Sequence, residues 1–261
     1  MATRITDYTE SITEQSRLEL LGIARWLADN KKTAYLVGGW AVYYYTKPGE
    51  RPSAKWGEAK WNKFKWDDPN GFKAVGSKDI DLVFQNKKEK EKFEQEYCRN
   101  NGYSKRGPVQ PKEWVKRVND ADIIFDPDVL SKTWRVRGAR VGWNHLTTYS
   151  VRLELDAGTS IMAPSKELLL LYKCVALIER TDARGKPNAE IARLDSKIWK
   201  DANDILALHD TGISAGALAS LAEKTGLARI LNYAKQIISV DYDEYGFTQY
   251  AFAKKFLELK P

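Results

Sequence analysis

The chain is poor in cysteine and has no long apolar run. Its 261 residues include only two cysteines, Cys98 and Cys174, which lie far apart in helix-compatible sequence. This excludes a disulfide framework and leaves no zinc-ligand spacing. No apolar run approaches the roughly 20 residues that cross a bilayer, and the segment from Met1 to Glu19 is polar rather than a signal peptide. We therefore expect a cytoplasmic protein with reduced thiols and no membrane partner.

The sequence also lacks internal repeats and low-complexity tracts. Charged residues make up 30% and hydrophobic residues 43%, as in an ordinary globular protein. The net charge of +7 fits either a well-dispersed basic enzyme or a partner of a polyanionic backbone. Nine tryptophans, several of which alternate with lysines, favour RNA or DNA as that partner.

The apolar pattern is mixed up to residue 163 and helical after it. It predicts helices over 8–30, 40–45 and 86–101, and strands over 33–37, 79–84, 114–118, 121–125, 133–137 and 149–155, with a short one near Ile161. Asp126-Pro127 is expected to stop the strand at 121–125. Helices are then predicted over 164–178, 190–208, 215–223, 227–240 and 243–259. The expected fold is α+β, with a mixed-sheet domain over 1–163 and an all-α helical bundle over 164–261.

One segment, 47–75, breaks this pattern with lysines interleaved among tryptophans. Long irregular insertions in compact domains are usually functional or mobile. Aromatic rings stack on bases and lysines meet phosphates, so an RNA-contacting flap is one interpretation. The other is an inserted helical hairpin whose tryptophans pack against the core.

Two short stretches carry the chemistry. In the first, an apolar run to Val37 meets Gly38 and Gly39 before helix-compatible sequence, which would let the backbone approach a phosphate. In the second, Asp79 and Asp81 lie two apart in a strand and so share a face. Two such carboxylates repel each other unless a cation lies between them, which predicts a site for Mg2+ or Mn2+.

Two-metal phosphoryl transfer requires a third carboxylate from a neighbouring strand. Asp122 is preferred because an apolar run follows it directly, and Asp120 shares its face. Glu154 or Asp156, in the strand at 149–155 and just after it, is the alternative.

The glycine pair followed by Asp79-Ile80-Asp81 resembles the polymerase-β-type nucleotidyltransferase superfamily. Later motifs are similar to those of AbiEii-type nucleotidyltransferases, the toxins of abortive-infection toxin–antitoxin pairs. They are Ala163-Pro164-Ser165-Lys166-Glu167-Leu168 with Lys173, Ala176 and Arg180, and then Lys200-Asp201-Ala202-Asn203-Asp204-Ile205. The resemblance implies a polymerase-β-like nucleotidyltransferase domain followed by a helical bundle.

The resemblance also implies roles for single residues. Gly38 and Gly39 would hold the triphosphate, with Ser77 in contact with phosphate, and Asp79 and Asp81 would bind the metal. Lys173 would neutralise nucleotide phosphates as a point charge, and Asp201 or Asp204 would act opposite it as a base or positioning group.

Three functions remain open. The first is metal-dependent transfer of a nucleoside monophosphate from an NTP to RNA, with tRNA as first choice and an antitoxin as a possible partner. The second keeps the chemistry but uses a small molecule, because Gly38-Gly39-Trp40-Ala41 is similar to the turn of aminoglycoside nucleotidyltransferases. The third is a non-catalytic nucleotide- or RNA-binding module.

Overall fold

The computed structural model describes residues 10–46, 77–105, 113–118, 121–186, 191–241 and 256–258. The insertion at 47–75 lies outside the described residues, as does most of the helix predicted over 243–259. Within the described ranges, no helix has the length and apolar character needed to cross a membrane.

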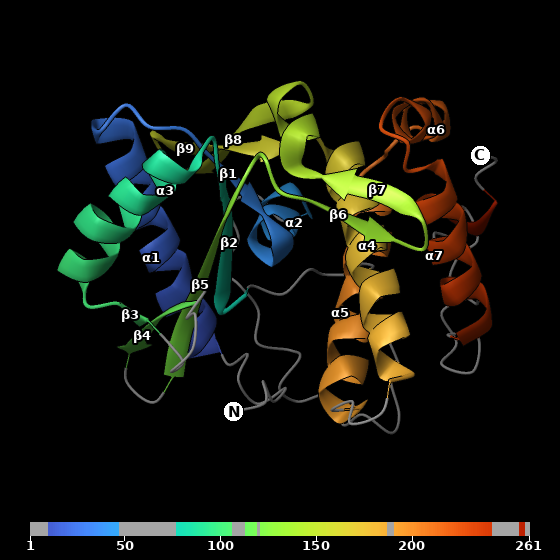
Figure 1. Cartoon of the computed structure of the whole chain (residues 1–261), viewed down its shortest axis with the longest axis horizontal. Coiled ribbons are helices and arrows are strands. Elements are labelled where there is room, and N and C mark those ends of the chain that lie inside the picture. Colours follow the sequence, from blue (N-terminus) through green and yellow to red (C-terminus); the bar gives the residue numbers. More distant parts are fainter. Residues whose placement is uncertain are drawn as a thin grey trace.

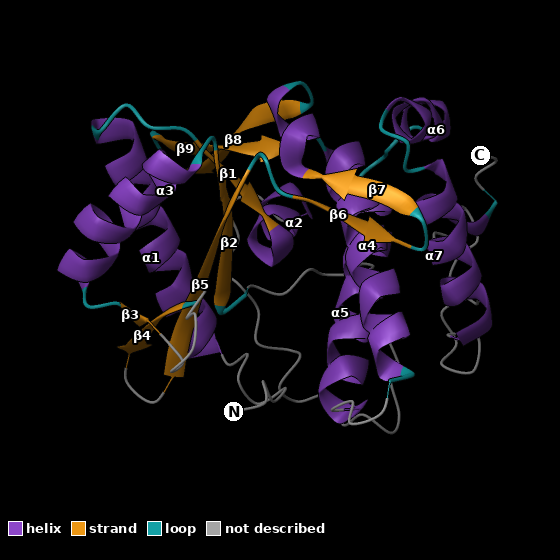
Figure 2. Ribbon diagram, viewed as in Figure 1, coloured by secondary structure: helices purple, strands orange, loops and turns teal. Residues whose placement is uncertain are grey.

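A mixed sheet forms the centre of the molecule (Figure 1, Figure 2). Its strands follow the order β3-β4-β5-β2-β1-β9-β8. The central strand β2 runs antiparallel to β1 and parallel to β5. The strands of the sheet are β1 Ala34–Val37, β2 Asp79–Phe84, β3 Ser104–Lys105, β4 Trp114–Val118, β5 Ala121–Val129, β8 Ser150–Asp156 and β9 Thr159–Pro164.

Helices cover both faces of this sheet. In Figure 1, α1 and α3 lie on one side of the strands, and α2, α4 and α5 lie on the other. Helix α4 packs against α5 and α7. The helices are α1 Glu10–Asp29, α2 Gly38–Thr46, α3 Lys87–Phe93, α4 Lys166–Arg184, α5 Ile191–Asp210, α6 Ala215–Lys224 and α7 Ala228–Asp241.

Side-chain caps determine where two of these helices begin. The Asn86 side chain accepts a hydrogen bond from the Glu89 backbone N–H at 2.9 Å, and Ser165 does the same for Leu168 at 3.3 Å. Such caps satisfy N–H groups that have no partner within the helix. Because Ser165 follows the last residue of β9, the change from strand to helix occurs at the predicted domain boundary.

The expected end of the strand at Asp126-Pro127 is wrong, because β5 continues to Val129. Proline lacks an N–H and would normally cost a ladder hydrogen bond. The N–H groups of Ile124 and Leu130 point to β2, so position 127 faces the other neighbour, β4. Within the described residues, the pairing of β4 with β5 extends to Trp114 and Phe125, so no described residue of β4 needs an N–H at position 127.

The segment predicted as a strand over 133–137 is one half of a hairpin. β6 Thr133–Val136 pairs with β7 Ala139–Gly142, a strand that the apolar pattern did not indicate. Both turn residues, Arg137 and Gly138, have positive φ angles of 44° and 84°. This backbone matches the right-handed twist of the two strands.

The α+β class is confirmed, with a mixed sheet, flanking helices and a run of helices towards the C-terminus. The core is continuous, and it includes the buried faces of β1, β2, α2 and α4. α4 and α5 also contact α2, which places the helical part of the chain directly beside the glycine turn.

Candidate active site

Gly38 directly follows the last residue of β1 and begins α2, and its backbone requires glycine. Its φ angle is +70°, a left-handed conformation that other residues rarely adopt. A side chain at this position would also collide with the Asp81 carboxylate. Val37 pairs with Asp81 across the two strands, so the predicted turn and the predicted acidic strand do meet.

At Gly39, residues from two other parts of the chain, Ser77 and Lys200 of α5, lie next to the same turn. A side chain there would begin 2.6 Å from Lys200 Nζ on α5 and 3.3 Å from Ser77 Oγ. The Ser77 hydroxyl accepts a hydrogen bond from the Asp79 backbone N–H at 3.3 Å. With the N–H groups that begin α2, these residues form a cradle of the kind that binds phosphate.

The acidic group lies on the edge of this cradle. Asp81 is in register with Asp126 on the parallel strand β5, and Asp79 and Asp81 share one face of β2. Burial and the nearby charge of Asp79 raise the pKa of Asp81 to about 6, with a further contribution from Asp126. Asp79 Oδ1 is buried and has no hydrogen-bond partner. These carboxylates therefore carry negative charge that the fold leaves poorly compensated.

Asp122 is not the carboxylate that the structure brings to this group. In the β2–β5 register, Asp126 lies opposite Asp81, and Asp122 lies four residues earlier, about 13 Å along the strand. Its carboxylate accepts a hydrogen bond from Arg117 of β4 at 3.2 Å. Asp120 lies outside the described residues.

The alternative pair, Glu154 and Asp156, lies on β8 at the edge of the sheet, three strands away from β2. Asp156 approaches Arg17 at 3.9 Å. The structure therefore does not bring either of these acids to the glycine turn.

Across from the sheet, Lys173 of α4 is held by two buried carboxylates of α5. Its Nζ lies 2.7 Å from Asp204 Oδ2 and 3.3 Å from Asp201 Oδ1. Asp204 also pairs with Lys200 at 3.1 Å, and Asp201 pairs with Arg180. The motif residues Lys173, Asp201 and Asp204 thus form one network, in which the carboxylates lie behind the lysine.

In this network, the lysine and the carboxylates keep one another charged. Burial opposes the charged form of Lys173, but Asp204 and Asp201 raise its pKa above the ordinary lysine value. Burial likewise opposes the charged form of Asp204, yet Lys173 and Lys200 lower its pKa. Both groups are therefore charged at neutral pH, and Lys173 presents a fixed ammonium.

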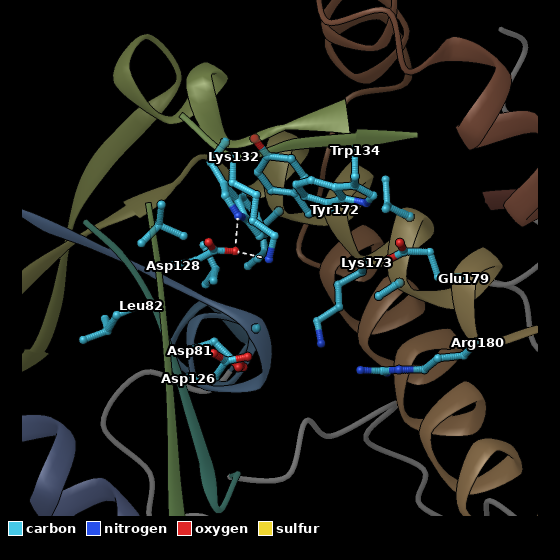
Figure 3. A pocket seen from close by; sticks show the side chains of 17 residues that line it. Asp81, Leu82, Asp126, Asp128, Lys132, Trp134, Tyr172, Lys173, Glu179 and Arg180 are labelled. Carbon is cyan, nitrogen blue, oxygen red and sulfur yellow. Dashed lines mark hydrogen bonds and ion pairs between the residues drawn. The ribbon is translucent and has the colours of Figure 1, made fainter. Parts of the chain in front are cut away.

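A cavity of about 570 Å³ joins these elements (Figure 3). Gly38, Asp81 and Asp126 line it on the sheet side, and Lys173 and Arg180 line it on the side of α4. Figure 3 shows Asp81 and Asp126 next to each other and the Lys173 ammonium pointing towards them. Trp134 of β6 and Trp143, which directly follows β7, also line the cavity. The volume is within the range of small-molecule sites.

Several residues of this site were missed in the sequence. Asp126 was passed over because Asp-Pro was interpreted as a strand end, although a carboxylate directly after the run Ile123-Ile124-Phe125 was a usable signal. Lys200 was quoted within a motif but given no role. The hairpin residues showed no pattern that would have placed them at the site.

The chemistry of the acidic group fits a hard divalent cation. Within the described ranges, no three histidine, cysteine or carboxylate side chains already converge as a complete metal site. Mg2+, however, is commonly held by one or two carboxylates and completes its shell with substrate phosphates and water. The partnerless Asp79 oxygen and the Asp81–Asp126 pair supply donors of this kind.

No protein-family model matches the sequence, and a search of curated proteins finds no match either. Among solved structures, the chain is similar to an antigenic nucleotidyltransferase-like protein from Paracoccidioides brasiliensis, at 13% identity and a TM-score of 0.47, over 85% of this chain and 92% of that one. It is also similar to the lincosamide antibiotic adenylyltransferase LnuA in its lincomycin-bound form, at 17% identity and a TM-score of 0.37, over 70% of this chain and 94% of that one. A third similar structure is the antibiotic-resistance factor ANT(2'')-Ia, at 12% identity and a TM-score of 0.40, over 85% of this chain and 98% of that one. These likenesses are distant, and the function has to be inferred from the residues of the cavity.

Proposed function

We propose that this protein is a metal-dependent nucleotidyltransferase, which moves a nucleoside monophosphate from an NTP to an acceptor and releases pyrophosphate. One observation carries the proposal. Gly38, in a conformation that excludes a side chain, lies against Asp81, and Asp81 is in register with Asp126. A polyphosphate cradle next to a cluster of carboxylates is the arrangement that nucleotidyl transfer needs.

Each part of the site has a role in this reaction. The N-terminal N–H groups of α2 bind the triphosphate, and Ser77 and Lys200 lie beside them. Asp79, Asp81 and Asp126 would hold the divalent cation, which stabilises negative charge on the α-phosphate. Lys173 supplies a point charge from the opposite side. Asp201 and Asp204 act as positioning residues, because their carboxylates orient Lys173 from behind.

The protein contributes mainly by holding the reactants in line. The cation-binding carboxylates lie on adjacent strands, and the phosphate cradle begins where β1 ends, so both are fixed by the sheet. Orientation of this kind lowers the barrier without further chemistry from the protein.

We propose RNA as the acceptor, with tRNA first, in line with an AbiEii-type toxin that has an antitoxin partner. The support is the net charge of +7 and the lysine- and tryptophan-rich segment 47–75, which lies outside the described residues. Binding to RNA through lysines should weaken steeply as the salt concentration rises.

A small-molecule acceptor is the second candidate, and the cavity favours it. A volume of about 570 Å³ is suited to a drug-sized molecule. Modification of such a molecule would not depend on the basic surface, so salt would have little effect on its KM.

The test is incubation with labelled NTPs, Mg2+ and either total RNA or a panel of small aminoglycoside-like acceptors. We expect label on RNA that disappears with EDTA, falls with salt, and is lost in Asp79→Ala. Label on a small molecule alone would replace the RNA proposal with the second candidate. A metal-independent nucleotide affinity that is unchanged in Asp79→Ala, with no transfer to any acceptor, would indicate a non-catalytic binding module.

A further inference from the structure

Three aromatic side chains form a continuous wall at the end of the cavity away from the glycine turn. Trp134 comes from β6, Trp143 begins the short 3-10 helix that directly follows β7, and Tyr172 comes from α4. The ring centroids of the two tryptophans are 5.2 Å apart, and those of Trp143 and Tyr172 are 4.8 Å apart in an edge-on contact. We call these three residues the aromatic wall; Figure 3 labels two of them, Trp134 and Tyr172. None of the roles described above uses it.

The aromatic wall is fixed to its surroundings by hydrogen bonds. Trp143 Nε1 donates to Asp128 Oδ2 on β5 at 2.9 Å, and the Tyr172 hydroxyl donates to the Gly142 carbonyl at 2.9 Å. Lys132 Nζ reaches the same Asp128 oxygen at 2.5 Å and lies 5.8 Å from the Trp134 ring. A surface that is already ordered loses little conformational freedom when a ligand binds to it. The aromatic wall is therefore suited to recognition of a flat ring.

The charge of the cavity indicates what that ring belongs to. The charged groups that line it are the carboxylates Asp81, Asp126, Asp128 and Glu179 and the cations Lys132, Lys173 and Arg180. A divalent cation held by Asp81 and Asp126 would bind the phosphate groups of an anionic ligand at this end of the cavity. Because the same cavity also touches Gly38, a nucleoside triphosphate can reach from the phosphate cradle to the aromatic wall.

Glu179 provides a selective group at the margin of the wall. Its carboxylate lines the cavity, as the Trp134 side chain does, and it is exposed. Its neighbour Arg180 is engaged by buried Asp201. A carboxylate can accept two parallel N–H groups from the edge of guanine, whereas adenine and cytosine offer it one amino group.

We propose that the aromatic wall holds the base of the incoming NTP and that Glu179 selects guanine over adenine. The inference rests on the proposed function, because it assumes that the triphosphate lies at Gly38. It adds the class of nucleotide, a purine nucleoside triphosphate with GTP preferred, which the acidic group and the glycine turn do not specify.

The test is calorimetric binding of non-hydrolysable GTP, ATP, CTP and UTP analogues in the presence of Mg2+, with inorganic tripolyphosphate as a probe of the cradle alone. Stacking on one aromatic residue corresponds to roughly 5- to 150-fold in affinity. We expect Trp134→Ala to weaken the GTP analogue by about tenfold or more and to leave tripolyphosphate unchanged. Trp134→Phe, which keeps a stacking face, should lose less than about threefold.

Glu179→Gln should lower the ratio of GTP to ATP affinity from roughly tenfold to near unity, because the amide accepts fewer N–H groups and carries no charge. The matched control is Glu223→Gln, an exposed glutamate on α6, which should keep the wild-type ratio. If Trp134→Ala lowers the melting temperature, Trp134→Phe is compared with Trp134→Leu, which keeps bulk but has no ring.

Two results separate the failure of this inference from that of the proposed function. If the wild type binds NTPs with Mg2+ but Trp134→Ala changes only the KM for the acceptor, the aromatic wall belongs to the acceptor and the inference is overturned. Equal affinity for all four analogues in the wild type overturns the guanine preference. If the wild type binds neither NTPs nor tripolyphosphate in the presence of Mg2+, the proposed function fails, and this inference fails with it.

Discussion

The two sides of the cavity differ in how far their buried charges are compensated by other residues of the chain. On the sheet side, Asp79 and Asp81 lie together with Asp126, and a buried oxygen of Asp79 has no partner. On the helix side, Lys173 is already paired with Asp204 and Asp201 in the folded chain. The sheet side thus depends on a ligand to compensate its charge, whereas the carboxylates of the helix side are already paired with cations, although one oxygen of Asp204 has no hydrogen-bond partner. This difference separates residues that serve the reaction from residues that hold the site in shape.

The largest effect on folding should come from removing a carboxylate of the ion-pair network on the helix side. Asp204→Ala leaves Lys173 and Lys200 without their shared carboxylate in a buried place, and loss of one partner of such a pair costs about 3–5 kcal/mol. Urea unfolding measures this loss. The control is Asp210→Ala, an exposed aspartate at the end of the same helix, which should stay within about 0.5 kcal/mol of the wild type. Equal stability of the two variants would show that the network does not hold the fold.

On the sheet side, the third carboxylate can be located by activity. Asp126→Asn should lower the transfer rate about a hundredfold or more at low Mg2+ concentration, because it removes charge next to Asp81. Asp122→Asn lies on the same strand and should stay within about twofold, since its carboxylate interacts with Arg117. The ratio of kcat/KM between the two variants is the measurement, and a larger loss in Asp122→Asn would restore the assignment made from the sequence.

The two sides should also respond to pH with opposite signs. Burial and Asp79 raise the pKa of Asp81 to about 6, so the metal-free folded protein binds this proton more tightly than the unfolded chain. The stability it contributes is present below about pH 4 and is lost as the pH rises through 6, a change of about 3 kcal/mol. Burial would raise the pKa of Asp204, but Lys173 and Lys200 lower it below the ordinary value. Asp204 therefore stabilises the fold at neutral pH, and this stabilisation is lost in acid.

Asp81→Asn should therefore raise the melting temperature of the metal-free protein at pH 7.5 while abolishing transfer. Added Mg2+ should stabilise the wild type more than this variant. Thermal unfolding with and without EDTA checks both statements, and a destabilised Asp81→Asn at pH 7.5 would contradict the first.

The smallest effect is expected at Gly39. Its neighbours are the flexible end of Lys200 and the hydroxyl group of Ser77, so Gly39→Ala should change the free energy of unfolding by less than about 1 kcal/mol. It should nevertheless weaken tripolyphosphate binding several-fold, because it displaces the Lys200 ammonium. Gly38→Ala, which meets Asp81 and has positive φ, should fold measurably worse in the same assay.

The sequence predicted the features that depend on local pattern. The strand that carries Asp79 and Asp81 was predicted with its observed bounds, because apolar residues alternate and two carboxylates share a face. The glycine turn was found because two glycines separate an apolar run from a helix. The change to a helical pattern near residue 163 was also visible, since Pro164 and Ser165 precede a continuous apolar helix.

Features that depend on tertiary pairing could not be predicted in this way. Whether Asp122 or Asp126 joins Asp81 depends on the β2–β5 register, and that register is set by contacts between segments some 45 residues apart. Pro127 misled the prediction because a proline ends a strand only where a neighbouring strand needs its missing N–H, and the sequence does not show which strands are neighbours. The burial of Asp201 and Asp204 behind Lys173 required the packing of α5 on α4, which a sequence motif does not describe.

The meeting of Gly39, Ser77 and Lys200 has a consequence for the timing of synthesis. The three residues come from widely separated parts of the chain, and the lysine belongs to α5. A nascent chain on the ribosome would have completed most of its sheet long before this lysine left the exit tunnel. If the cradle binds nucleotide as proposed, it stays incomplete until α5 has emerged and packed beside the glycine turn.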